Sequence, residues 1–177
     1  MLTKGIIDED FVNYKIPSMF IACPTCSFKC EKECGKQVCQ NSTLANSTSI
    51  EIDNRQIVSR YMNNPITKAI CFAGLEPLDN FENVASLIYC FRANGCKDDI
   101  VIYTGYTEAE AKNMTFKVVQ RNNLAYRNYP YSVMEVLKSL TPIVVKYGRF
   151  IPNQESHYDE VLGVNLASKN QYAVRYE

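Results

Sequence analysis

Eight cysteines mark this 177-residue sequence, and five of them fall within seventeen residues: Cys23, Cys26, Cys30, Cys34 and Cys39. Thiolates are soft ligands suited to zinc or to iron–sulfur clusters. Three cysteines on a [4Fe–4S] cluster leave one iron open to a small molecule, whereas a fourth closes the cluster and favours plain electron transfer. A four-sulfur zinc site also fits the spacing, so the cysteines alone leave zinc and iron–sulfur about even.

The bulk composition predicts a cytoplasmic protein with reduced thiols. The acidic amino-terminal segment, residues 1–10, does not read as a signal peptide. No apolar run approaches the roughly 18–20 residues that span a bilayer. In a reducing compartment the cysteines are not expected to form disulfides. Lysine plus arginine total 19 and aspartate plus glutamate 19, so no attraction to nucleic acid or to a membrane is predicted.

Four short runs rich in apolar residues are predicted to be strands: residues 18–23, 68–73, 99–104 and 142–147. Near-continuous apolar strands are typical of a parallel sheet that is covered on both faces. Helix starts are predicted between them from capping-box spacings, which are Asp53 with Gln56, Asp79 with Glu82, Thr107 with Glu110, and Ser132 with Glu135. The alternation of strand and helix predicts an α/β fold.

Four further segments complete the predicted pattern. The second predicted helix has an apolar face from Phe81 to Phe91 and should stop near Gly95. Residues 115–130 are ambiguous and could hold a short extra strand, and residues 147–158 are expected to be loop. The alternating QYAVRY at the carboxyl terminus suggests an edge strand. No linker is evident, so residues 1–177 are expected to form a single domain.

Unusual segments follow each predicted strand. They are the cysteine segment, AGLEP at residues 73–77, TGY at residues 104–106 and YGRF at residues 147–150. Ligands of parallel sheets gather at the carboxyl ends of the strands. One active-site face is therefore predicted.

These segments, in this order, resemble the radical S-adenosylmethionine (SAM) activating proteins of glycyl radical enzymes, especially the small activase of anaerobic ribonucleoside-triphosphate reductase. SMFIACPTCSFKC, VCQN, GLEP, IVIYTGY, GRFIPNQ and LASKNQ carry the similarity, which runs from residue 18 to the carboxyl terminus. The resemblance implies an incomplete parallel β/α barrel of the radical SAM type, formed as a single domain over residues 1–177, with a cluster-binding loop at about residues 23–41.

The resemblance also implies three metal ligands. The family pattern is C-x3-C-x2-C, and Cys26 and Cys30 match its first pair. No cysteine occupies position 33, so Cys39 is the preferred third ligand, because apolar Val38 precedes it and Gln-Asn follows it as in relatives. An insertion at about residues 31–36 then lies between the second and third ligands. Cys34 is the alternative third ligand, and Cys23 is a less favoured alternative.

A SAM pocket is implied by the same resemblance. GLEP is similar to the family's GGEP motif, with Leu75 in place of the second glycine. A glycine at position 74 lets the backbone approach a ligand, and the Glu76 carboxylate can pair with the methionyl ammonium group. The remaining cofactor-binding residues are predicted to be Val38, Thr104 and Gly105.

The implied reaction is the reductive cleavage of SAM. A flavodoxin or ferredoxin would reduce a [4Fe–4S] cluster whose open iron holds SAM, and the S–C5′ bond would break to give methionine and a 5′-deoxyadenosyl radical. That radical would abstract hydrogen from a glycine of the partner enzyme. The alternatives are a radical SAM enzyme acting on another peptide or small molecule, an electron carrier with a closed cluster, and a zinc-stabilised interaction module.

Overall fold

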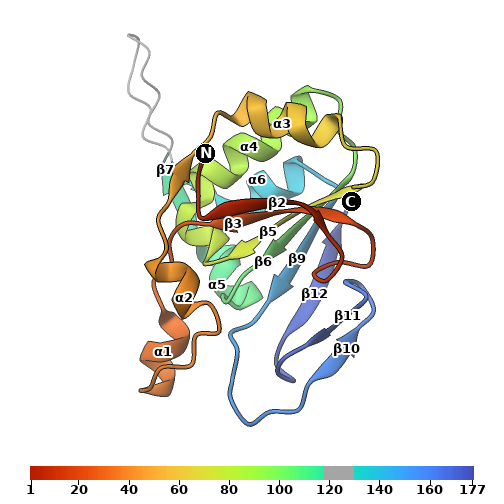
Figure 1. Cartoon of the computed structure of the whole chain (residues 1–177). Helices are drawn as coiled ribbons and strands as arrows, with labels where there is room; N and C mark the ends of the chain where they lie inside the picture. Colours follow the sequence, from red (N-terminus) through yellow and green to blue (C-terminus); the bar gives the residue numbers. More distant parts are fainter. Residues whose placement is uncertain (118–129) are drawn as a thin grey trace.

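A six-stranded sheet forms the centre of the molecule in the computed structural model, which describes residues 1–117 and 130–177 (Figure 1). The strand order is β12-β9-β6-β5-β3-β2. The strands are β2 (Gly5–Asp10), β3 (Ser18–Cys23), β5 (Ala69–Gly74), β6 (Asp99–Tyr103), β9 (Ile143–Tyr147) and β12 (Tyr172–Tyr176). β3, β5, β6 and β9 pair in parallel, which confirms the four predicted strands and their pairing.

Both edges of the sheet are antiparallel. β12 pairs with β9, which confirms the strand predicted at the carboxyl terminus. β2 pairs with β3 at the other edge, although its sequence GIIDED was not predicted to be a strand. An edge strand tolerates charged side chains because they remain in water and discourage further pairing. The fold is therefore α/β, and the incomplete barrel and the single domain stay predictions.

Four helices cover one face of this sheet: α3 (Asn54–Met62), α4 (Phe81–Ala93), α5 (Glu108–Asn113) and α6 (Val133–Ser139) (Figure 1). The predicted capping box at Thr107 and Glu110 is present. Ser132 caps α6 by accepting a hydrogen bond from the backbone of Glu135, as predicted. Asp53 caps α3, but through the backbone N–H of Arg55. The chain leaves α4 beside Gly95, whose φ of +82° is the left-handed conformation expected of a stop.

The prediction that Asp79 caps the second helix is wrong. Pro77 begins a 3-10 turn, Pro77–Asn80, before α4 starts at Phe81. Asp79 therefore lies within the 3-10 turn before α4, and its carboxylate does not cap that helix. It accepts hydrogen bonds from the backbone N–H of Ser27 at 2.6 Å and from the Tyr106 hydroxyl at 2.5 Å. Asp79 thus connects two loops at the carboxyl ends of the strands.

Alternating residues of the strands serve two separate cores. Ile70 and Phe72 of β5 point to the face that α3, α4, α5 and α6 cover, here called the helix face. Ala69, Cys71 and Ala73 point to the opposite face, here called the cavity face. This is the two-residue period of a strand.

A hairpin covers one end of the cavity face. It consists of β10 (His157–Asp159) and β11 (Val164–Leu166), which pair antiparallel. Its buried Leu162 and Leu166 join Tyr14, from the turn between β2 and β3, in the core of this face. The prediction of loop for residues 147–158 is wrong at its last positions, because β10 begins at His157.

Short elements complete the described chain. They are α1 (Lys29–Cys34), α2 (Ser42–Asn46), the pair β1 (Leu2–Thr3) and β4 (Ile50–Glu51), and the pair β7 (Thr115–Lys117) and β8 (Pro130–Ser132). β7 confirms a strand at the start of the ambiguous segment, whose residues 118–129 lie outside the described residues. Within the described chain, no helix is long and apolar enough to cross a membrane.

Candidate functional site

A cavity of about 680 Å³ lies on the cavity face and extends to the carboxyl ends of the parallel strands. A volume of this size suits a small-molecule cofactor. All nine residues that were predicted to bind the cluster or SAM line it, namely Cys26, Cys30, Val38, Cys39, Gly74, Leu75, Glu76, Thr104 and Gly105. They come from three segments that are far apart in sequence, so the fold brings the predicted site together.

The five clustered cysteines divide between this cavity and other surroundings. Cys26, Cys30 and Cys39 line the cavity. Cys23 is fully buried in the core of the helix face, because it is the last residue of β3 and alternates with Ala22. Cys34 is the last residue of α1 and lies outside the cavity wall. The structure thus separates the three preferred ligands from both alternatives.

The three thiols of the cavity do not converge on one point. Within residues 1–117 and 130–177, no three His, Cys, Asp or Glu side chains lie close enough together to hold a single metal ion. A zinc ion needs all of its sulfur ligands at about 2.3 Å from one centre. Each iron of a [4Fe–4S] cluster takes its own cysteine, so the ligand sulfurs stay apart on different corners.

The loop that carries these cysteines is held in a specific conformation. Phe28 adopts a φ of 52°, which is left-handed, and its N–H donates a hydrogen bond to the Cys26 sulfur at 3.2 Å. The backbone N–H of Cys39 donates to the Glu31 carboxylate at 3.2 Å. Burial raises the pKa of the Cys26 thiol to about 11, and burial together with the nearby Cys39 raises the pKa of Cys30. Metal binding would have to displace these protons.

Glu76 is the buried carboxylate of the cavity. It accepts hydrogen bonds from the Thr104 hydroxyl at 2.7 Å, from the N–H of Gly105 at 2.8 Å and from the N–H of Leu78 at 3.0 Å. Burial raises the pKa of Glu76 to about 7, despite these three donors. A cationic ligand would favour the ionised form by restoring part of the lost solvation.

Gly74 lets α2 and β3 approach the end of β5 closely. Its φ is +79°, and a Cβ there would lie 2.9 Å from the Leu44 side chain and 3.1 Å from Ala22. The Asn41 side chain donates to the carbonyl of Gly74 at 2.6 Å. The N–H of Glu76 donates to the carbonyl of Thr25 at 2.8 Å. The GLEP segment and the cysteine loop are thus joined by one hydrogen bond from a side chain and one between backbones.

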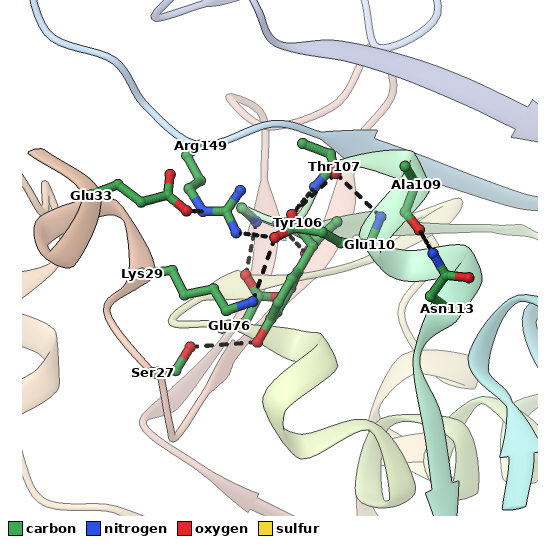
Figure 2. Close-up of polar contacts among 12 residues, drawn as sticks. Ser27, Lys29, Glu33, Glu76, Tyr106, Thr107, Ala109, Glu110, Asn113 and Arg149 are labelled. Carbon is green, nitrogen blue, oxygen red and sulfur yellow. Dashed lines mark hydrogen bonds and ion pairs between the residues drawn. The ribbon is translucent and has the colours of Figure 1, made fainter.

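A charged network joins α1 to the loops on the other side of the cavity (Figure 2). Arg149 forms ion pairs with Glu110 at 2.6 Å and with Glu33 at 3.4 Å, and Lys29 forms a third with Glu110 at 3.4 Å. The hydrogen bond from Arg149 is the main reason that the pKa of Glu110 falls to about 2. Lys29 also lies 4.5 Å above the centre of the Tyr106 ring. These contacts fix α1 beside the cavity.

Sequence reasoning missed two residues of this region. Tyr106 connects the loops through its hydroxyl, which donates to Asp79 and lies 3.4 Å from the Ser27 hydroxyl. Lys146 lines the cavity although it belongs to β9, and it is only 7% exposed. The sequence did contain a signal for Lys146, namely its position within the apolar run PIVVKY. A lysine in a buried strand is unusual, because lysine is almost never buried unless it is paired.

Comparison with known proteins gives one match. The model of the 4Fe-4S single cluster domain family matches residues 18–165, which extend from β3 to β11 and include all nine predicted site residues. No curated protein and no solved structure matches the chain.

Proposed function

Because the chain belongs to the 4Fe-4S single cluster domain family, we propose that it is a radical SAM activase that generates a glycyl radical on an anaerobic ribonucleoside-triphosphate reductase. One observation carries this proposal: a single cavity at the carboxyl ends of the parallel strands holds three free thiols from the segment that follows β3, together with a buried carboxylate that follows β5. We further propose that the sheet is the incomplete barrel of the radical SAM type.

Cys26, Cys30 and Cys39 would hold the [4Fe–4S] cluster in this proposal. When bound and reduced by a flavodoxin or ferredoxin, the cluster supplies the electron that cleaves SAM. The N–H of Phe28, which already donates to the Cys26 sulfur, would stabilise its thiolate. Burial raises the pKa of Cys26 and so favours the thiol, and metal binding would drive its deprotonation.

Glu76 would bind the amine of SAM. A carboxylate has about four acceptor positions. Three are taken by the donors of Thr104, Gly105 and Leu78, which hold the carboxylate in one orientation and leave one position for an ammonium group. The ammonium would also lower the pKa of Glu76 from about 7, so that the carboxylate becomes ionised at neutral pH. Gly74, Leu75 and Val38 complete the wall around this position.

The positions of the remaining cysteines support an open iron rather than a closed electron carrier. A carrier would need a fourth cysteine ligand. Cys23 is fully buried on the helix face, and Cys34 lies outside the cavity wall. Either residue would have to leave its present surroundings to reach the cavity. The cluster would therefore keep one corner for SAM.

The proposal is tested by anaerobic reconstitution with iron and sulfide, followed by incubation with SAM and dithionite. We expect a brown protein that releases 5′-deoxyadenosine, and a glycyl radical detected by electron paramagnetic resonance when a candidate reductase is added. A cluster with four protein ligands, or no release of 5′-deoxyadenosine, would refute it. Release of 5′-deoxyadenosine without a glycyl radical would overturn the assigned partner and favour a radical SAM enzyme that acts on another peptide or small molecule.

The matched pair Cys39→Ala and Cys34→Ala tests the ligand set. Cys39→Ala should lose the cluster, because its thiol lines the cavity. Cys34→Ala should retain it, because that thiol lies on α1 outside the cavity wall. Iron content and visible absorption report the outcome. The reverse result would assign the third ligand to Cys34.

A further inference from the structure

Lys146 is a charged side chain inside the cavity that the site described above does not use. It follows Val144 on the cavity face of β9, and its register partners are Tyr103 on β6 and Ala173 on β12. Only 7% of the residue is exposed, and it lines the cavity. The lysine therefore points into the space that would hold the ligand.

The ammonium group of Lys146 has unused donors. It carries three N–H bonds. Within the described residues it donates one hydrogen bond, to the carbonyl of Gly148 at 2.7 Å, and no carboxylate forms an ion pair with it. Burial lowers the pKa of Lys146 to about 8, which shows that its charged form is poorly solvated. An anion arriving in the cavity would find two free donors.

The one hydrogen bond of Lys146 does not explain its burial. The Gly148 carbonyl also accepts a hydrogen bond from the Gln171 side chain at 3.2 Å. That carbonyl would therefore remain bonded without the lysine. A buried ammonium that satisfies no otherwise unpaired group is costly to the fold, and such a cost is typical of residues kept for binding.

Among the described residues, two other cations line the cavity, Arg149 and Lys29, and both are already paired with carboxylates. Arg149 forms ion pairs with Glu110 and Glu33. Its guanidinium is therefore a poor candidate to bind a further anion. Lys146 is the cation that an anionic ligand group would reach without displacing a protein carboxylate.

Lys146 lies on β9 and Glu76 follows the end of β5; these two strands flank β6, and their axes are roughly 10 Å apart. The Glu76 charge is felt at Lys146, where it raises the pKa against the effect of burial. Two buried groups of opposite charge on one cavity wall match an α-amino acid, which carries an ammonium and a carboxylate on one carbon. We propose that Lys146 binds the carboxylate of the amino-acid part of SAM while Glu76 binds its amine, an inference that rests on the proposed function.

The test compares SAM with decarboxylated SAM, which keeps the sulfonium and the amine. Dissociation constants are measured by anaerobic calorimetry on the cluster-loaded full chain and on Lys146→Met, which keeps the side-chain length but removes the charge. We expect Lys146→Met to weaken SAM binding about 10- to 100-fold, the range for one charge-assisted hydrogen bond. Binding of decarboxylated SAM should change less than about threefold. Any contact of the carboxylate with iron is common to both proteins and cancels in this comparison.

Two further variants control the test. Lys97→Met removes the same charge from an exposed position before β6 and should leave both affinities unchanged. Lys146→Arg keeps a cation and should keep the preference for SAM, which also covers the case in which Lys146→Met fails to fold. Equal weakening of both ligands in Lys146→Met would overturn the inference and leave the proposed function standing. Absence of SAM binding by the unmodified protein would overturn both.

Discussion

The raised pKa of Glu76 can be tested by measuring how the stability of the protein depends on pH with and without this carboxyl group. Replacing Glu76 by Gln gives an uncharged side chain of the same size. Burial raises the pKa of Glu76 from its usual 4.5 to about 7 in the folded protein. The folded state therefore holds this proton more tightly than the unfolded state. Stability is lost as the pH rises from 4.5 to about 7, and the full loss is present above pH 7.

The size of the effect follows from that difference in pKa. At about 1.4 kcal/mol per tenfold change, ionisation of Glu76 costs the folded protein about 3 kcal/mol at high pH. Most of this cost, about 2 to 3 kcal/mol, develops between pH 5 and pH 8. Glu76→Gln also loses an acceptor for the N–H of Gly105, but this loss does not depend on pH. The stability of Glu76→Gln relative to the unmodified protein should therefore rise by about 2 to 3 kcal/mol from pH 5 to pH 8.

Urea unfolding of both proteins without cluster or SAM, at half-unit steps from pH 5 to pH 8, measures this change. Taking the difference between the two proteins removes every other titrating group that they share. Lys146, whose pKa is lowered to about 8, is the neighbour that could respond, so the pair is also measured in a Lys146→Met background. A difference between the two proteins that stays constant with pH would refute the reasoning, because it would mean that Glu76 is already ionised in the folded protein at pH 5.

Three further changes are expected to act on stability, each measured by urea unfolding. Gly74→Ala should cost about 1 to 3 kcal/mol more than Gly95→Ala, since both glycines have positive φ but only Gly74 lacks room for a Cβ. Equal costs would refute the close packing around Gly74. Arg92→Met should cost about 2 to 4 kcal/mol, because its guanidinium donates to four backbone carbonyls, whereas Arg55→Met at an exposed position should leave stability unchanged. Thr107→Ala should cost about 1 kcal/mol by removing a helix cap, and no change would show that the cap is dispensable.

The three cysteines that line the cavity were predictable as a set because their signals are local. Cys26 and Cys30 stand four residues apart, and Cys39 follows Val38 in a recognisable segment. The alternation of side chains along β3 also places Cys23 on the face opposite the cavity. That assignment needed the knowledge of which face the helices cover. Strand order and helix placement settle that question, and neither is encoded in the cysteine segment.

The failed prediction of a helix cap at Asp79 has a long-range cause. Asp79 has the spacing of a helix cap, yet Pro77 starts a 3-10 turn and the carboxylate bonds to Ser27 and Tyr106 instead. These partners are 52 and 27 residues away in the chain. A cap is favoured by about 1 kcal/mol, so long-range hydrogen bonds to a charged group can outweigh it.

The sequence by itself determined the elements whose signals repeat within a few residues: the four apolar strands, the caps of α5 and α6, and the thiols at the end of the first parallel strand. Only the tertiary structure decided that Lys146 faces the cavity and that Arg149 is neutralised by Glu110 and Glu33. The physical reason is the separation along the chain of the residues that produce each property. Strand and helix periodicity arise from neighbouring residues, whereas the solvation and charge pairing of a side chain depend on segments that meet only when the sheet has assembled.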